Sequence, residues 1–262
     1  MPTLKILDIS ATIGCNLSCK GCNHFSNYFA PNSKLDTDAL ISDIETILPR
    51  IDIERVSVIG GEPLLNPRCE EIVNACRSHT NSPVYLYTNG LLLFQNEDWI
   101  RKVLEDPKVF LRISIHLKEV EDIIKKFNHP KVLVTEHHTG QDRWFDSIKK
   151  RDGKVYPYNQ GRIAKSYKAC SCPNTQLFKG KLWKCPNTAF LRELLSVTEQ
   201  SEEEEWQEYL VDGLDVMCSD DELTKFCENS KLPNKVCNMC TAKPLHFSAA
   251  IQENGKRKVI LS

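Results

Sequence analysis

The sequence predicts an α/β protein built around a parallel sheet. Short apolar runs alternate with segments whose apolar residues recur at helical spacing from residue 5 to residue 135. Glycine, cysteine and polar side chains follow several of the predicted strands directly. Strands that alternate with helices of this length form βαβ units, and a parallel sheet carries its ligand-binding loops at the carboxyl ends of its strands.

The elements follow one another in a regular order. The predicted strands are residues 5–9, 55–59, 84–88, 109–116 and 131–135, and the predicted helices are residues 36–48, 67–79, 97–104 and 119–127. Asp36 or Thr37 can cap the first helix, and Asn89-Gly90 is a turn pair that closes the third strand. Residues 154–158 are a candidate sixth strand.

Composition excludes several classes of partner. The chain has 262 residues and a formal net charge of −1, which gives no electrostatic reason to expect nucleic acid or an anionic membrane. No apolar run approaches the roughly 18 residues that span a bilayer. Residues 1–5 lead straight into a strand rather than a signal peptide, so we expect a cytoplasmic protein.

The twelve cysteines indicate metal or redox chemistry, because disulfides are rare in a chain without an export signal. Three cysteines lie in the first 22 residues and seven lie in the last third. Cys69 and Cys76 are seven residues apart on a predicted helix, and we expect both to be buried core residues.

Two motifs follow the first two strands. Cys15, Cys19 and Cys22 have the spacing C-x3-C-x2-C, and three thiolates can hold three irons of a four-iron cube while the fourth iron stays open. Gly60-Gly61-Glu62-Pro63 follows the second strand. Taken singly, the first motif could be a zinc site and the second an ordinary turn.

Together, and in this order, the motifs resemble those of the radical S-adenosylmethionine (SAM) superfamily. The resemblance implies that residues 1–160 form a partial (β/α)6 TIM-like barrel that binds a [4Fe-4S] cluster and SAM. One electron, from a flavodoxin- or ferredoxin-like donor, would split SAM into methionine and a 5'-deoxyadenosyl radical, which abstracts a hydrogen atom from a small-molecule substrate.

The resemblance also assigns SAM-binding residues. Glycine at positions 60 and 61 permits close backbone approach, and Glu62 can accept a hydrogen bond from the methionine ammonium. Ser114 resembles the strand-four residue that contacts the SAM ribose. The residues expected to bind SAM are Gly60, Gly61, Glu62, Pro63, Asn89 and Ser114.

One position departs from the superfamily pattern. The residue before the third cysteine is commonly aromatic in the superfamily, whereas this chain has Gly21 there. We expect Asn23, His24 or Phe25 to supply the adenine packing instead.

The last third of the chain, residues 161–262, resembles the twitch domain, the short form of the SPASM extension. Its pattern is Cys172-x7-Gly180-x4-Cys185 followed by Cys237-x2-Cys240, with a hairpin around Lys179-Gly180. The resemblance implies a second, auxiliary [4Fe-4S] cluster held by four thiolates.

Alternatives remain open within this extension. The same four thiolates could hold zinc, and Cys170 could replace Cys172 as a ligand. Cys218 and Cys227 do not fit the string that a second auxiliary cluster needs, so we expect them in the core and keep them as reserve ligands.

Three residues are candidates for the chemistry on substrate. His116 ends the fourth strand, where SPASM-type relatives often have an acid, and could be a substrate contact or a base. Glu136 ends the fifth strand beside His137 and His138, of which at most one would point inward. Arg162, just upstream of the auxiliary cysteines, could bind a polar substrate or the SAM carboxylate.

The sequence therefore predicts a radical SAM oxidoreductase that dehydrogenates a small polar, sugar-like substrate, as in the twitch dehydrogenases that the extension resembles. A first alternative is a radical SAM epimerase or isomerase, or a modifier of a peptide or nucleotide. An alternative of another class is a zinc-stapled binding protein without catalysis.

Overall fold

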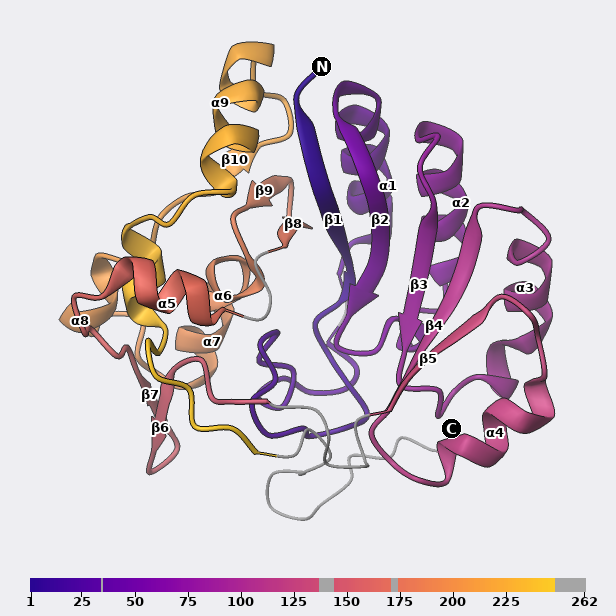
Figure 1. The fold of residues 1–262 in the computed structure, drawn as a ribbon, viewed down its shortest axis with the longest axis horizontal. Helices are drawn as coiled ribbons and strands as arrows, with labels where there is room; N and C mark the ends of the chain where they lie inside the picture. Colours follow the sequence, from indigo (N-terminus) through magenta and orange to yellow (C-terminus); the bar gives the residue numbers. More distant parts are fainter. Residues whose placement is uncertain (34, 137–143, 171–173, 248–262) are drawn as a thin grey trace.

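A computed structural model describes residues 1–33, 35–136, 144–170 and 174–247. It confirms the predicted fold class: a mixed α/β protein with an eight-stranded, mostly parallel sheet of order β10-β9-β8-β1-β2-β3-β4-β5 (Figure 1). Within the described ranges, no helix is long and apolar enough to cross a membrane.

The first half of the chain supplies five parallel strands and four helices, close to the predicted bounds. The strands are β1 (Thr3–Thr12), β2 (Asp52–Gly60), β3 (Val84–Thr88), β4 (Val109–Ile115) and β5 (Val132–Glu136). The helices are α1 (Thr37–Ile47), α2 (Cys69–His79), α3 (Glu97–Val103) and α4 (Val120–Phe127). Short 3-10 turns are η1 (Leu48–Arg50), η2 (Pro63–Leu65) and η3 (Phe94–Asn96).

The second half of the chain contributes shorter elements. The strands are β6 (Lys149–Arg151), β7 (Lys154–Tyr156), β8 (Thr175–Phe178), β9 (Lys181–Trp183) and β10 (Leu214–Asp215). The helices are α5 (Ile163–Ala169), α6 (Pro186–Ala189), α7 (Leu191–Val197), α8 (Glu204–Gln207), α9 (Asp220–Ser230) and the 3-10 helix η4 (Lys235–Met239).

The two faces of the parallel sheet differ. Val84 and Leu86 on β3 are buried in the core that the sheet forms with its helices. Tyr85 and Tyr87 alternate with them and are half-buried, because successive residues of a strand face opposite sides. Helices α1 to α4 lie together along the strands, and the segments from α5 onward lie on the β8 side of the sheet (Figure 1).

The sheet runs across the predicted boundary between residues 160 and 161. The predicted hairpin is confirmed: β8 and β9 pair antiparallel around Lys179 and Gly180, both of which have positive φ. Strand β8 also pairs parallel with β1, where Leu7 lies opposite Thr175. The extension therefore completes the sheet that the barrel begins.

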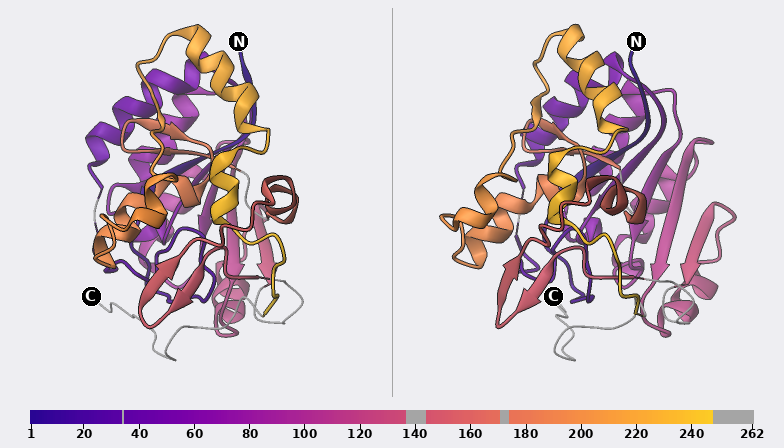
Figure 2. Two further views of the ribbon diagram at one scale, coloured as in Figure 1. Left: turned by 90° about the vertical axis from the view of Figure 1, so that its left-hand side faces the viewer. Right: turned by 60° about the vertical axis from the view of Figure 1, so that its left-hand side comes forward.

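The predicted sixth strand is wrong. Residues 154–156 form β7, which pairs antiparallel with β6 in a separate two-stranded hairpin. Asp152 and Gly153 turn this hairpin with positive φ at both positions, the geometry that an Asp-Gly pair favours. The hairpin projects away from the main sheet (Figure 2).

Candidate metal centres and active-site cavity

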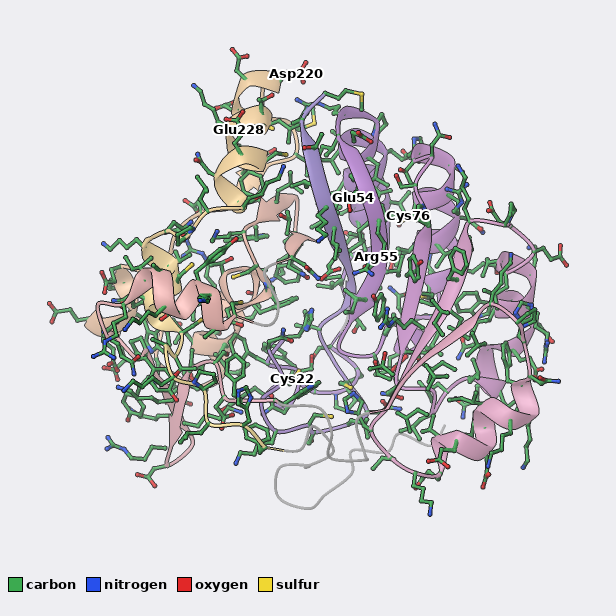
Figure 3. All side chains as sticks on the ribbon, in the orientation of Figure 1. Cys22, Glu54, Arg55, Cys76, Asp220 and Glu228 are labelled. Atoms are coloured by element: carbon green, nitrogen blue, oxygen red, sulfur yellow. The ribbon has the colours of Figure 1, made fainter. Side chains whose placement is uncertain are left out.

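A cavity of about 650 Å³ lies at the carboxyl ends of the parallel strands. Side chains or backbone from each of β1 to β5 line it, together with cysteines from both halves of the chain. Cys22 lies at the end of the sheet toward which the strands point (Figure 3). This position agrees with the rule that parallel sheets bind ligands beyond their carboxyl ends.

The first three cysteines share the wall of this cavity. Cys15 and Cys19 are each 8% exposed, and Cys15, Cys19 and Cys22 all line the space. Burial, followed by the negative charges of Glu62, Cys19 and Cys22, raises the pKa of the Cys15 thiol well above its usual value. Thiols that oppose one another's ionisation in this way need a bound cation to become thiolates together.

The two glycines of the Gly-Gly-Glu-Pro motif bring its loop against the cysteine loop. A Cβ atom on Gly60 would lie 2.3 Å from the carbonyl oxygen of Thr12, and one on Gly61 would lie 2.1 Å from that of Gly14. Both glycines and Pro63 line the cavity. The two glycines therefore allow the backbone of this loop to lie directly against the backbone of the cysteine loop.

Glu62 is directed into the protein rather than into the cavity. Its carboxylate is fully buried and accepts hydrogen bonds from the N–H of Leu64 (3.1 Å), the hydroxyl of Thr88 (2.8 Å) and the N–H of Asn89 (2.7 Å). Burial raises the pKa of this carboxyl to about 7, against the opposing effect of the three hydrogen bonds. The structure shows a residue that orders the β2 and β3 loops and offers no open face to the expected SAM ammonium.

The other expected SAM-binding residues, Asn89 and Ser114, do line the cavity. The side-chain amide of Asn89 donates to the side-chain oxygen of Asn16 (2.7 Å) and lies 3.8 Å from the sulfur of Cys15. Sequence reasoning missed Asn16, although its place directly after Cys15 is a signal that could have found it.

Gly21 is explained by its surroundings. It has φ of +73°, and a Cβ there would lie 2.7 Å from the Phe247 ring and 3.0 Å from the carbonyl oxygen of Phe145. Residues from elsewhere in the chain, Phe247 and Phe145, therefore lie close against Gly21.

Two of the three residues expected to pack the adenine remain available. Asn23 and His24 line the cavity. Phe25 is instead 1% exposed within the second core cluster. Trp144 and Phe145, which sequence reasoning missed, also line the cavity. They follow the fifth strand in sequence, but no local pattern marked them.

The second group of thiols surrounds a small space of its own. Cys170, Cys185, Cys237 and Cys240 line a cavity of about 30 Å³, and three of them, Cys170, Cys185 and Cys240, also line the large cavity. Burial raises the pKa of Cys185 to about 11, and the charges of Cys170 and Cys237 add to this effect. Cys172, the ligand expected from the sequence, lies outside the described residues.

Among the residues that the structure describes, no three His, Cys, Asp or Glu side chains converge so as to hold one metal ion. Asn187 donates a hydrogen bond of 3.2 Å to the sulfur of Cys240, the kind of contact that tunes a cluster.

The three candidate catalytic residues have different outcomes. His116 is 8% exposed, lines the cavity and packs edge-on against Trp144 at 5.4 Å between ring centroids. Glu136 ends β5, while His137 and His138 lie outside the described residues. Arg162 precedes α5, has an exposed side chain and does not line the cavity, so the structure does not bring it to the site.

The remaining cysteines pack in the core, as expected from the sequence. Cys69, Cys76 and Cys227 are at most 1% exposed, and Cys218 packs partly buried against the same core cluster. None of these four cysteines lines either of the two cavities.

The fold and the cysteine loop define a class of protein. The model of the radical SAM superfamily matches residues 9–149, more than half of the chain, and the chain belongs to that superfamily. The family implies a [4Fe-4S] cluster and SAM, and the fitting residues here are the buried, mutually repelling thiols of Cys15, Cys19 and Cys22.

Curated relatives match less than half of the chain. It is 31% identical over 116 residues to GTP 3',8-cyclase of Aquifex aeolicus, which covers 43% of this chain and 35% of the relative. It is 34% identical over 93 residues to a probable GTP 3',8-cyclase of Methanococcus aeolicus. This match covers 34% of this chain and 31% of the relative. The chain thus matches about a third of the length of these relatives.

Solved structures show a weaker likeness. A structure described as BtrN in complex with AdoMet and 2-DOIA is 16% identical with a TM-score of 0.49, covering 94% of this chain and 98% of that one. Native anSMEcpe with bound AdoMet is 24% identical with a TM-score of 0.38, covering 52% and 43%.

Proposed function

We propose that this chain is a radical SAM oxidoreductase that dehydrogenates a small polar, sugar-like substrate. Residues 1–160 would hold the SAM-binding cluster, and residues 161–262 would hold an auxiliary [4Fe-4S] cluster. The observation that carries the proposal is that one cavity is lined by thiols of both groups, among them Cys15 and Cys240. We propose that a substrate of sugar size binds in this cavity, between the two redox centres.

The auxiliary ligand set is proposed to be Cys170, Cys185, Cys237 and Cys240. These four thiols line one small cavity, and Cys170 takes the place that the sequence assigned to Cys172. Four thiolates saturate a cluster, so this centre would serve electron transfer rather than bind a second SAM.

Once bound, the catalytic cluster and SAM supply the one-electron chemistry that removes a hydrogen atom from the substrate. The chain's own residues bind, orient and exclude water. Trp144 and Phe145 place aromatic surface on the cavity wall. His116 lines the cavity, and we propose that it takes the proton that a two-electron oxidation also releases. The auxiliary thiols would hold the acceptor of the second electron at the same wall.

Anaerobic reconstitution tests this proposal. Two clusters predict about eight irons per chain, release of 5'-deoxyadenosine on reduction by flavodoxin or ferredoxin, and one SAM consumed per oxidised product. Repeated turnover on one SAM would indicate the epimerase or isomerase alternative. Bound zinc without SAM cleavage would establish the non-catalytic binding protein and refute the proposal.

A second candidate is radical modification of a nucleotide. The curated relatives are named GTP 3',8-cyclases, although the matches cover 43% and 34% of this chain. Incubation of the reduced protein with SAM and GTP decides this case: nucleotide-dependent 5'-deoxyadenosine and a new nucleotide product would establish it, and an unchanged GTP peak would remove it.

A further inference from the structure

Two arginines on the inner face of the sheet have no role in the chemistry described so far. Arg55 on β2 and Arg112 on β4 both line the large cavity, and Figure 3 shows Arg55 part-way along its strand. We propose that Arg55 and Arg112 form a subsite for an anionic group of the substrate, either a phosphate or a carboxylate. This inference rests on the proposed function, because it specifies the substrate of the same cavity.

The guanidinium of Arg112 is held in place by its neighbours and keeps N–H donors for a ligand. Its guanidinium lies over the ring of Tyr87, 5.7 Å from the ring centroid, and donates two hydrogen bonds to the hydroxyl of Thr135 (3.2 and 3.1 Å). Thr135 lies opposite Ser114 in the β4–β5 register, two residues beyond Arg112, so the side chain points toward the carboxyl end of its strand. A guanidinium has five N–H donors, and a neutral hydroxyl does not compensate its charge.

Arg55 lies deeper and carries an unpartnered buried donor. Its guanidinium lies over Tyr85, 5.4 Å from the ring centroid, and its Nε is buried without a hydrogen-bond partner. The charge of Arg55 acts on the buried acid Asp8, which already accepts hydrogen bonds from Asn174 (3.1 Å) and Gln176 (2.9 Å). A buried donor without a partner destabilises a protein unless a ligand satisfies it.

Other arginines of the described ranges behave differently. Most of them form ion pairs with carboxylates, which are Arg50–Asp220, Arg68–Glu71, Arg77–Asp106, Arg101–Glu97, Arg151–Asp152 and Arg192–Asp212. Arg55 and Arg112 have no such pair among the described residues. Partly buried cations in a cavity, each over a tyrosine ring and without a protein anion, are suited to an anion from outside.

Binding measurements on the reconstituted holoprotein test the subsite. The probes are ribose 5-phosphate, glucuronate and neutral ribose and glucose, titrated by anaerobic calorimetry with and without saturating SAM. We expect one of the two anions to bind at least tenfold more tightly than its neutral counterpart, because charge-assisted hydrogen bonds to arginine are strong.

Variants connect that preference to the two residues. Arg55→Gln and Arg112→Gln should each weaken binding of the preferred anion about tenfold or more. Arg112→Lys should weaken this binding less, because lysine keeps the positive charge. The matched control is Arg151→Gln, whose side chain is 74% exposed on β6 and outside the cavity; it should bind the anion as the wild type does.

Each outcome of these binding measurements supports or refutes the anion subsite. Preference for ribose 5-phosphate assigns a phosphate, and preference for glucuronate assigns a carboxylate. Equal affinity for charged and neutral probes, anion binding that saturating SAM abolishes, or glutamine variants that bind like Arg151→Gln would overturn the subsite. If a glutamine variant does not fold, the wild-type preference and Arg112→Lys still decide.

The proposed function fails separately from this subsite. It fails if the wild-type protein releases no 5'-deoxyadenosine on reduction, whatever anion it binds. A protein that cleaves SAM but binds no anion would refute the subsite alone.

Discussion

The side-chain amide of Asn89 donates a 2.7 Å hydrogen bond to the side-chain oxygen of Asn16, which joins the end of β3 to the first cysteine loop. The backbone N–H of Asn89 meanwhile binds the carboxylate of Glu62. Three loops that follow β1, β2 and β3 are thus connected by direct hydrogen bonds around the sulfur of Cys15. The position of the cluster loop therefore depends on polar side chains that need not touch any cofactor.

The Asn16 contact predicts a loss of order in the cysteine loop. Asn16→Ala removes the oxygen acceptor of the buried Asn89 amide and leaves it only the more distant sulfur of Cys15, which costs about 1–3 kcal/mol. We expect weaker SAM binding and a lower melting temperature in anaerobic assays. Asn16→Asp keeps an oxygen acceptor and should lose less stability. Equal behaviour of Asn16→Ala and the wild type would contradict this role.

Glu62 predicts a dependence of stability on pH. Its pKa of about 7 in the folded chain lies above the usual 4.5, so its contribution to stability is full below pH 4.5 and is lost as the pH rises through about 7. The loss is on the order of 3 kcal/mol. Denaturant titration of the cluster-free protein at pH 5 and pH 8, under anaerobic conditions, measures it.

The matched variant for this test is Glu62→Gln, which does not titrate. It should be destabilised at both pH values, because its amide meets the N–H donors of Leu64 and Asn89, and it should show a smaller difference between them. A wild-type stability that stays unchanged between pH 5 and pH 8 would show that the carboxyl is already ionised in the folded chain at pH 5, and would contradict the raised pKa.

The second thiol group predicts which cysteine holds the auxiliary cluster. Cys170 lines the small cavity with Cys185, Cys237 and Cys240. Cys170→Ala should therefore lower the iron content from about eight to about four per chain, whereas Cys172→Ala should leave it unchanged. If Cys172→Ala lowered the iron content and Cys170→Ala left it unchanged, Cys172 would be the ligand and this assignment would be wrong.

The bond from Asn187 to Cys240 predicts a change in reduction potential. A donor to sulfur stabilises the reduced, more negative cluster, so Asn187→Ala should lower the potential of the auxiliary centre. A hydrogen bond of about 1 kcal/mol corresponds to about 40 mV for one electron. Redox titration followed by EPR measures the shift, and the exposed Asn229→Ala on α9 serves as the control.

Gly21 predicts a specific cost of adding one methyl group. Gly21→Ala combines an unfavourable positive φ with a collision against Phe247 and Phe145. Gly153→Ala has a similar φ of +77° but meets no atom within 4 Å, so it isolates the effect of backbone conformation. We expect Gly21→Ala to lower the melting temperature more than Gly153→Ala does; equal shifts would mean that the aromatic contacts are readily displaced.

Local patterns were enough to predict the parallel strands and the hairpin. Strand β3 occupies residues 84–88, as predicted, because its alternation and its Asn-Gly turn are both local signals. Residues 154–158 were misassigned because the Asp152-Gly153 turn, an equally local signal, was not weighed against the order of strands.

The site was predictable only in part. Spacing identified Cys15, Cys19 and Cys22, since their chemistry depends on a short loop. It could not identify Arg112, because what that side chain meets is set by the register of β4 against β5. Arg162 was expected at the site from its sequence distance to the cysteines, and the path of the chain after β7 leaves it exposed instead.

The pairing of β8 with β1 has a consequence for how the protein is made. Asp8 belongs to the first strand, but its donors Asn174 and Gln176 follow more than 160 residues later. Contacts of such long separation form slowly. During synthesis β1 therefore lacks its β8 neighbour, and Asp8 lacks these two donors, until the last third of the chain leaves the ribosome. We therefore expect the two halves to unfold together in one cooperative transition, so that removing either half destabilises the other.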